Sequence, residues 1–264
     1  MSGDLPIGGR TLTGDVFDMG ETVDLGAEIR GVFFDAGNTL TYLDVEWIAG
    51  RLRDDGWEMD ESALVYGQNV AAYELSRMAL LKKYASDADR ITPYFARVLE
   101  LAGIPEGFAG ECANILMEEH AKSILWRSVP DFVAPTLAEL RRRGYILGVI
   151  SNSDGRIKPL LERHNLTSLL TFIIDSAAVG VEKPDPEIFR MATDAAETQP
   201  HKCVFVGDIY AVDIEGARRS GLKGVLLDPL CLHSEFHCAR ITTLTDLLDI
   251  LPPIKGVAQE AGDE

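Results

Sequence analysis

The chain has 264 residues, 46% of them hydrophobic and 25% charged, and its formal net charge is −17 at pH 7, a composition typical of a globular protein with ample core. This negative charge argues against a nucleic-acid partner, because contacts to phosphates need clustered Lys and Arg. No apolar stretch approaches the ~20 residues of a membrane helix, and no secretory signal is visible at the N-terminus, so we expect no membrane partner and a cytoplasmic location.

The first half of the chain changes character twice. Residues 1–29 are rich in Gly and Asp without a sustained period, which predicts a loosely ordered extension. The apolar run 31–34 then predicts a buried strand that ends at Asp35. From 45 to 127 the apolar residues recur at helical spacing and strand signals are absent, so we expect an all-helical unit there.

From Pro130 onward strands and helices alternate. Helices are expected over 135–143, 157–164, 186–198 and from Asp208 to Gly221, and strands over 145–150, 172–174, 203–206 and 225–227, the last being the final core strand. Asp185 can cap the helix that begins at Pro186, because proline lacks only an N–H that would be unpaired there.

This alternation predicts an α/β fold with a Rossmann-like three-layer core. Its strands are continuous apolar runs, as in parallel sheets that helices cover on both faces. We expect the core to comprise 30–44 and 128–251, interrupted by the helical unit 45–127 and followed by an acidic tail, 252–264, that is frayed.

Four polar clusters stand at the ends of apolar runs. They are Asp35 with Asn38 and Thr39, Ser151 with Asn152, Lys183 in a Lys-Pro-Asp-Pro segment, and Asp208 with Asp213. In an open α/β sheet ligands bind outside the carboxyl ends of the strands, so these side chains should converge on one edge. Three carboxylates, a hydroxyl and a lysine suit a divalent metal and a phosphate-like anion.

The four clusters, in this order and spacing, resemble the motifs of the haloacid dehalogenase superfamily. The matching segments are residues 34–40 (FDAGNTL), 150–152 (ISN), 180–189 (GVEKPDPEIF) and 206–208 (VGD) followed by Asp213 and Gly216-Ala217. Most members are Mg²⁺-dependent phosphatases, so the resemblance implies a hydrolase acting on a small phosphorylated substrate. It also implies that 45–127 is the helical cap that the family inserts between its first and second motifs.

The resemblance implies a role for each acidic residue. Asp35 would be the nucleophile and would form an aspartyl-phosphate that water then hydrolyses. Mg²⁺ would be held by Asp35, Asp208 and the carbonyl of Gly37. Asp213 would contact the metal or its waters, with helix capping as its alternative role.

The remaining motif residues would bind the anion. Lys183 would neutralise the transferred group and hold Asp35 as its anion, and Ser151 would donate a hydrogen bond to the same oxygens. Thr39 would brace the loop after the nucleophile beside the substrate. Asn152 would either orient the substrate or close a turn.

Gly37 departs from the pattern. The family's phosphatases carry a second aspartate two residues after the nucleophile, which protonates the leaving group and later activates water; such a group is typically worth ~10²–10⁴-fold in rate. The chain can still be a phosphohydrolase, slower or limited to good leaving groups such as acyl or aryl phosphates. Asp44 or a residue of the helical unit is the candidate substitute for the missing acid.

Two alternatives remain open. The same aspartate can serve a dehalogenase or a phosphonatase. A dehalogenase needs no metal and so has no use for Asp208 and Asp213. A phosphonatase needs a lysine from the helical unit, for which Lys82 and Lys83 are the adjacent candidates. Otherwise the protein is a catalytically retired member that binds a phosphometabolite or a protein partner.

Three further features are left open. Cys231, His233, His237 and Cys238 fit no common zinc spacing, so we interpret this segment as an ordinary surface loop, with zinc as the alternative. The helical unit carries eight basic or aromatic residues that could face the site, namely Arg51, Arg53, Tyr73, Arg77, Lys82, Lys83, Tyr84 and Arg90. The sequence does not determine the oligomeric state.

Overall fold

The core of the protein is a parallel β-sheet. The computed structural model describes residues 25, 28–80 and 88–255. Its six strands are ordered β3-β2-β1-β4-β5-β6, and every neighbouring pair is parallel. Their bounds are β1 Gly31–Phe34, β2 Ile146–Ser151, β3 Phe172–Asp175, β4 Cys203–Gly207, β5 Lys223–Leu227 and β6 Ala239–Ile241. From β1 the sheet extends through β2 to β3 on one side and through β4 and β5 to β6 on the other. Such folds bind ligands where the strand order switches sides, here between β1 and β4.

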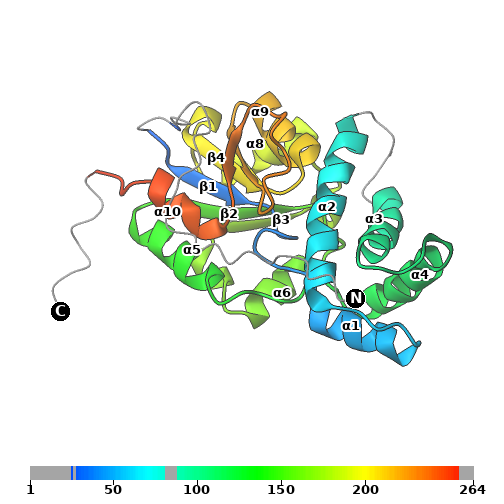
Figure 1. Cartoon of the computed structure of the whole chain (residues 1–264). Coiled ribbons are helices and arrows are strands. Elements are labelled where there is room, and N and C mark those ends of the chain that lie inside the picture. The colour runs from blue at the N-terminus through cyan, green and yellow to red at the C-terminus, as the bar shows by residue number, and fades with distance from the viewer. Residues whose placement is uncertain (1–24, 26–27, 81–87, 256–264) are drawn as a thin grey trace.

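Helices cover both faces of this sheet (Figure 1). Alternate residues of β1 point to opposite faces, so Val32 and Phe34 join one apolar core and Phe33 joins the other. The first core includes side chains of α5 (Val133–Arg142), α6 (Ile157–Arg163) and α10 (Leu247–Ile250), and the second those of α8 (Pro186–Ala195) and α9 (Glu215–Arg219). The predicted α/β class with a Rossmann-like three-layer core is therefore confirmed.

Some boundaries differ from the sequence prediction. The strand Val225–Leu227 is not the last, because β6 follows it; β6 has three residues and one is an arginine, too weak a pattern to detect. Helix α8 ends at Ala195, three residues before the predicted end. Its start is confirmed, since the Asp185 carboxylate accepts the Glu187 N–H at 2.9 Å.

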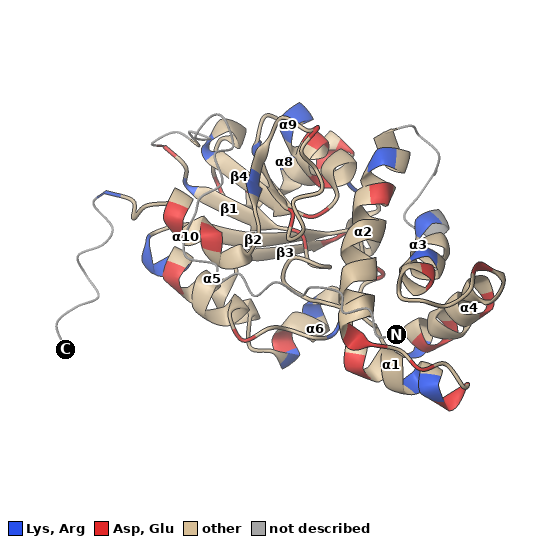
Figure 2. Cartoon of the chain, viewed as in Figure 1, with Lys and Arg blue, Asp and Glu red and all other residues tan. Residues whose placement is uncertain are grey.

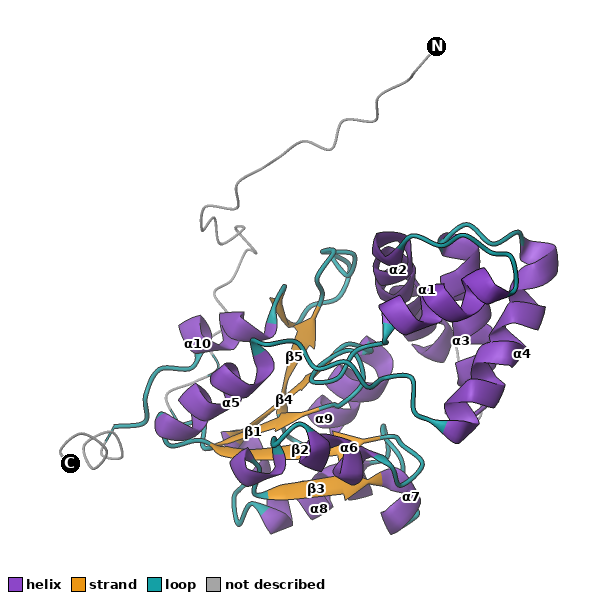
Figure 3. Ribbon diagram, turned by 90° about the horizontal axis from the view of Figure 1, so that it is seen from below, coloured by secondary structure: helices purple, strands orange, loops and turns teal. Residues whose placement is uncertain are grey.

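A separate group of helices lies between β1 and β2 in the chain and to one side of the sheet in space (Figure 3). These are α1 Val45–Asp54, α2 Glu61–Leu80, α3 Ala88–Leu101 and α4 Glu106–Lys122. They have an apolar core of their own in which Leu52, Leu99 and Leu116 are fully buried. Whether they act as a cap stays a prediction, as do the domain boundaries.

The two segments that join these helices to the core are paired with each other. The backbones of Tyr42 and Ser128 exchange two hydrogen bonds, of 2.7 and 3.0 Å. Asp44 caps α1 by accepting the Trp47 N–H at 3.1 Å, and its second oxygen accepts from Arg127 at 2.9 Å. Asp44 is thus committed to the helix start and an ion pair, and it does not line the cavity described below.

The rest of the surface shows mixed charge. Figure 2 shows Lys and Arg interspersed with Asp and Glu along the helices of both parts. None of the helices that the structure describes is both long and apolar enough to cross a bilayer. The predicted frayed segments fall mainly on 1–24, 26–27 and 256–264, outside the described residues, whereas Leu25 and Ile29 are buried in the core.

Candidate active site

Three carboxylates meet at the carboxyl edge of the sheet. Asp35 follows β1, Asp208 follows the neighbouring β4, and Asp213 lies one turn further on; one oxygen from each lies within 4.8 Å of the others. Among the described residues, this is the only group of three or more His, Cys, Asp or Glu side chains that approach so closely. Parallel pairing of β1 with β4 therefore brings together residues that are far apart in the sequence.

A tight turn positions the first motif. The Asp35 N–H extends the β1–β4 ladder by donating to the Val206 carbonyl at 2.8 Å. The chain then folds back so that the Ala36 carbonyl accepts both the N–H and the hydroxyl of Thr41, at 2.8 and 3.1 Å. Asn38 adopts a positive φ of 53°, a conformation that asparagine tolerates better than most residues. Its amide donates to Asp208 Oδ2 at 3.0 Å, which joins the first motif to the fourth.

Asp213 reaches the site through a wide turn. It lies in a π-helical turn, Tyr210–Ile214, where the sequence predicts the start of an α-helix. π-turns insert one residue into a helix and occur often at functional sites. The Asp213 carboxylate accepts the Ile209 N–H at 2.9 Å and lies directly over Gly207, where a Cβ atom would come within 2.5 Å of its Cγ. A side chain at position 207 would displace this carboxylate.

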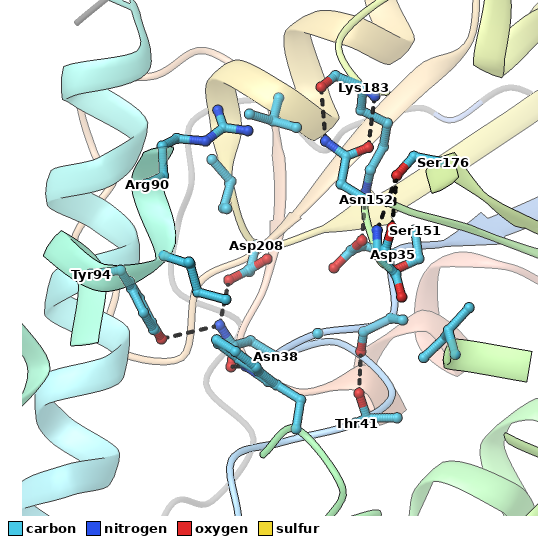
Figure 4. Close-up of a pocket in the computed structure, with 18 of the residues that line it drawn as sticks. Asp35, Asn38, Thr41, Arg90, Tyr94, Ser151, Asn152, Ser176, Lys183 and Asp208 are labelled. Atoms are coloured by element: carbon cyan, nitrogen blue, oxygen red, sulfur yellow. Dashed lines mark hydrogen bonds and ion pairs between the residues drawn. The ribbon is translucent and has the colours of Figure 1, made fainter. Parts of the chain in front are cut away.

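Lys183 is the cation of the site. Its ammonium group lies 2.5 Å from Asp35 Oδ1 and 2.7 Å from Asp213 Oδ1, and its side chain is 2% exposed. Asn152 holds its backbone from both sides, because the amide oxygen accepts the Lys183 N–H at 2.7 Å and the amide nitrogen donates to the Lys183 carbonyl at 2.9 Å (Figure 4). Ser151, the last residue of β2, is buried beside Asp35.

The electrostatics of this group favour a bound cation. Burial raises the pKa of Asp35 to about 6, although Lys183 opposes the shift. Burial and the neighbouring Asp213 and Asp35 raise the pKa of Asp208 well above its usual range. Burial alone would lower the pKa of Lys183, but Asp213 and Asp35 outweigh it, so the ammonium stays charged.

One ammonium balances only one of three carboxylates. With all three ionised, two negative charges remain uncompensated in a buried site, which is costly unless a cation joins them. Carboxylate oxygens are the protein ligands that Mg²⁺ prefers. The donor set therefore fits a divalent metal held by Asp35, Asp208 and Asp213.

Comparison with known proteins identifies the family. The model of the haloacid dehalogenase-like hydrolases matches residues 29–221, which is well over half of the chain. The chain belongs to this family. The resemblance inferred from the four sequence motifs is thereby confirmed, and the protein is a hydrolase of this superfamily.

Curated relatives of this hydrolase extend over most of its length. It is 30% identical over 248 residues to haloacid dehalogenase-like hydrolase domain-containing protein 3 of Homo sapiens, covering 87% of this chain and 96% of that protein. The mouse protein of the same name matches over 61% of its own length. The glyceraldehyde 3-phosphate phosphatase of Pyrococcus furiosus is 28% identical, covering 88% of this chain and 97% of that protein.

A solved structure with the same fold is the putative HAD-hydrolase YfnB from Bacillus subtilis. It superposes with a TM-score of 0.59 at 19% identity, covering 85% of this chain and 99% of that one.

Beside the nucleophile candidate, this hydrolase has an aromatic ring in place of an acid. A Cβ atom built at Gly37 would lie 3.6 Å from Trp126 Cδ1, an ordinary contact with the edge of the indole. The Trp126 N–H donates to Asn38 Oδ1 at 2.9 Å, and the Tyr94 ring stacks on Trp126 with centroids 5.8 Å apart. Burial raises the pKa of Tyr94, so its hydroxyl remains protonated.

The predicted site residues come together with one exception. A cavity of about 480 Å³ is lined by seven of them, Asp35, Gly37, Ser151, Asn152, Lys183, Asp208 and Asp213. Thr39 is fully buried and does not line the cavity. The direct contact of each residue with a substrate stays a prediction.

The structure adds residues to which the motifs gave no role. Asn38 links Asp208 to Trp126, and Tyr94, His120 and Trp126 line the same cavity. Tyr94 belongs to an apolar helical pattern, so nothing in its local sequence distinguishes it from a core residue. Of these residues, only Asn38 could be expected near the site from the sequence, because it belongs to the polar cluster after β1.

Most of the basic and aromatic candidates of the helical unit serve other contacts. In the described residues of α1 to α4, Arg90 is the only Lys or Arg that lines the cavity. Arg51 and Arg53 pair with Asp55 and Glu58 respectively, and Tyr73 donates to Glu235. Lys82, Lys83 and Tyr84 lie outside the described residues.

The Cys and His residues after β5 form no metal-binding cluster. In the described part of the chain, Cys231, His233, His237 and Cys238 are not among the side chains grouped closely enough to share an ion. His233 is not on the surface, as the loop interpretation had it, but 3% exposed, with its ring against Tyr73 and Nδ1 3.1 Å from Asp228.

Proposed function

We propose that this hydrolase is a Mg²⁺-dependent phosphatase that acts on a small phosphorylated metabolite through an aspartyl-phosphate on Asp35. The observation that carries the proposal is the group of three carboxylates with one buried ammonium between two of them. Relatives named glyceraldehyde 3-phosphate phosphatase and phosphoserine phosphatase support it.

Each side chain has a part in the proposed reaction. A carboxylate oxygen of Asp35 attacks phosphorus, the O–P bond forms, and the leaving oxygen departs with the electron pair of the bond that breaks. Lys183 keeps Asp35 ionised and offsets charge on the transferred group, and Ser151 donates to the phosphoryl oxygens. Mg²⁺, when bound, reduces the repulsion between the carboxylates and the phosphate dianion.

The second half of the reaction releases phosphate. Water attacks the aspartyl-phosphate and restores the Asp35 carboxylate. With Gly37 in place of the usual aspartate, no carboxylate at that position takes the proton from water, so we expect slow turnover. Asp44 does not replace it, because its two oxygens are held by the Trp47 N–H and Arg127.

The test is hydrolysis of phenyl phosphate with and without Mg²⁺, by the wild type, Asp35→Asn and the control Asp194→Asn. Asp194 is an exposed residue of α8 paired with Arg190, so its variant should behave as wild type. We expect metal-dependent hydrolysis that Asp35→Asn lowers by at least about 10⁴-fold.

Other outcomes identify the alternatives. Metal-independent release of halide from 2-haloacids would make the protein a dehalogenase. Tight binding of phosphorylated metabolites with no hydrolysis of any would make it a retired enzyme.

A further inference from the structure

The cavity next to the proposed nucleophile has two unlike sides. One side is the charged sheet edge. The other comes from the inserted helices and the segment that follows them. It is mostly apolar or aromatic, with Arg90 and His120 as its polar members; the others include Leu75, Ile91, Tyr94, Met117, Ile124 and Trp126. We expect the part of a substrate that is not phosphate to lie against this second side.

The aromatic part of this wall is rigid. The Trp126 ring is fixed by its hydrogen bond to Asn38 and by stacking with Tyr94, whose plane is tilted 28° from it. Phe95 packs against the same ring with centroids 5.2 Å apart. Because the indole N–H is already bonded, Trp126 presents ring carbon to the cavity instead of a free polar group.

His120 adds no charge to this wall. Its Nδ1 accepts the Leu125 N–H at 3.2 Å, which places the proton of the neutral ring on Nε2. Burial and the nearby Arg156 lower the pKa of His120, which also favours the neutral ring. The ring meets Trp126 edge-on with centroids 5.8 Å apart.

The position of the missing acid borders this surface. Gly37 lies two residues after Asp35, and the indole edge stands 3.6 Å from the point where a Cβ at Gly37 would be. The space two residues after the nucleophile therefore holds a ring edge and no carboxylic acid of residue 37. An alkoxide would have to depart unprotonated, which is slow. A phenolate departs without an acid, because the pKa of its phenol is only about 10.

We infer that the substrates of this site are aryl phosphates, phosphomonoesters of a planar apolar group that packs against the Trp126–Tyr94 wall. This inference rests on the proposed phosphatase function. A sugar or glycerol body would leave hydroxyl groups unbonded against ring carbon, whereas an aromatic ring gains contact area and stacking there. In the reaction the Asp35–phosphorus bond forms, the phosphorus–oxygen bond to the ring breaks, and the phenolate leaves with the electron pair and takes its proton from water.

The test compares phenyl phosphate with glycerol 3-phosphate, phosphoserine and glyceraldehyde 3-phosphate. We expect kcat/KM to be at least about 100-fold higher for phenyl phosphate, since only the alkyl esters need the missing acid. Because phenyl phosphate is also the more reactive ester, binding is measured separately by competitive inhibition. Phenylphosphonate should inhibit about tenfold more tightly than ethylphosphonate.

Variants of Trp126 separate stacking from folding. Trp126→Leu should raise KM for phenyl phosphate about tenfold, and Trp126→Phe, which keeps a flat ring but loses the bond to Asn38, should raise it less. Trp57→Leu is the matched control, because Trp57 packs against Phe108 in the same helical unit outside the cavity.

Failure of this inference differs from failure of the proposed function. Asp35-dependent hydrolysis that favours alkyl phosphates, or equal inhibition by the two phosphonates, would overturn only the aryl class. So would a Trp126→Leu protein whose KM rises equally for phenyl and acetyl phosphate. Absence of any Asp35-dependent hydrolysis would overturn the proposed function and this inference with it.

Discussion

The sheet edge and the inserted helices line one cavity but bring opposite chemistry to it. At the sheet edge, Asp35, Lys183 and Asp213 are joined by ion pairs of 2.5 and 2.7 Å. Across the cavity, Trp126 and Tyr94 stack and offer ring carbon. The first side is built from strand ends, whose spacing the sheet imposes, and from the loops and turns beside them. The second depends on how helices pack, so it can change between relatives without disturbing the first.

The largest effect is expected from Gly37→Asp, which adds an acid between the two sides of the cavity. A Cβ at this position meets only ordinary contacts, so the change should fold. We expect kcat/KM for glycerol 3-phosphate to rise by about 100-fold, since alkyl esters lack only the acid, and kcat/KM for phenyl phosphate to change little.

Gly37→Asn is the matched control, because its side chain has nearly the same shape and no acid. An equal gain for both substrates, or the same gain with asparagine, would show that the missing acid does not separate them. If the wild type is inactive and Gly37→Asp restores hydrolysis, the protein is a retired enzyme.

A second test concerns the charge of the sheet edge. The pKa of Asp35 is raised from 3.8 to about 6. Between these two pH values the metal-free folded protein therefore binds more protons than the unfolded chain. Its stability should therefore fall as pH rises from about 4 through 6. Mg²⁺ needs the ionised carboxylates, so it should stabilise the protein more at pH 7.5 than at pH 5.

Thermal unfolding with EDTA or Mg²⁺ at the two pH values measures this difference. At a Mg²⁺ concentration one hundred times Kd, the gain is about 2.7 kcal/mol. Asp208→Asn should abolish most of this gain, and Trp126→Leu should preserve it. Equal stabilisation by Mg²⁺ at both pH values would mean that these carboxylates do not bind the metal.

The sequence predicted the sheet edge far better than the opposite wall, for a physical reason. Asp35 and Asp208 each end a continuous apolar strand, and parallel strands place such residues on one edge whatever else the chain does. Asp213 was expected at a helix start, yet it reaches the site from a π-turn over Gly207, a detail set by close packing. Trp126 could not be recognised, because its position depends on contacts with Asn38 and Tyr94 from distant segments.

A smaller effect is expected at Asn152, which holds Lys183 by two backbone hydrogen bonds. Asn152→Ala removes both and lets the lysine move away from Asp35. Since two hydrogen bonds of about 1 kcal/mol each are lost, we expect kcat to fall about thirtyfold. Asn69→Ala on α2, whose side chain bonds only within its helix, is the control for stability. A fall in the melting temperature without a fall in kcat would make Asn152 a residue of the turn alone.

The smallest expected effect belongs to Arg90, the one cation that the described helices α1 to α4 bring to the cavity (Figure 4). Its side chain is largely buried, so a carboxylate on the aromatic ring of a substrate would gain from its charge. Arg90→Gln should raise KM for 4-carboxyphenyl phosphate about fivefold and leave phenyl phosphate nearly unchanged, a difference of about 1 kcal/mol. Arg97→Gln is the control, since Arg97 lies on the same helix outside the cavity and pairs with Glu74 and Glu100. Equal losses for both substrates would show that Arg90 supports helix packing, and the wall would then select for ring shape alone.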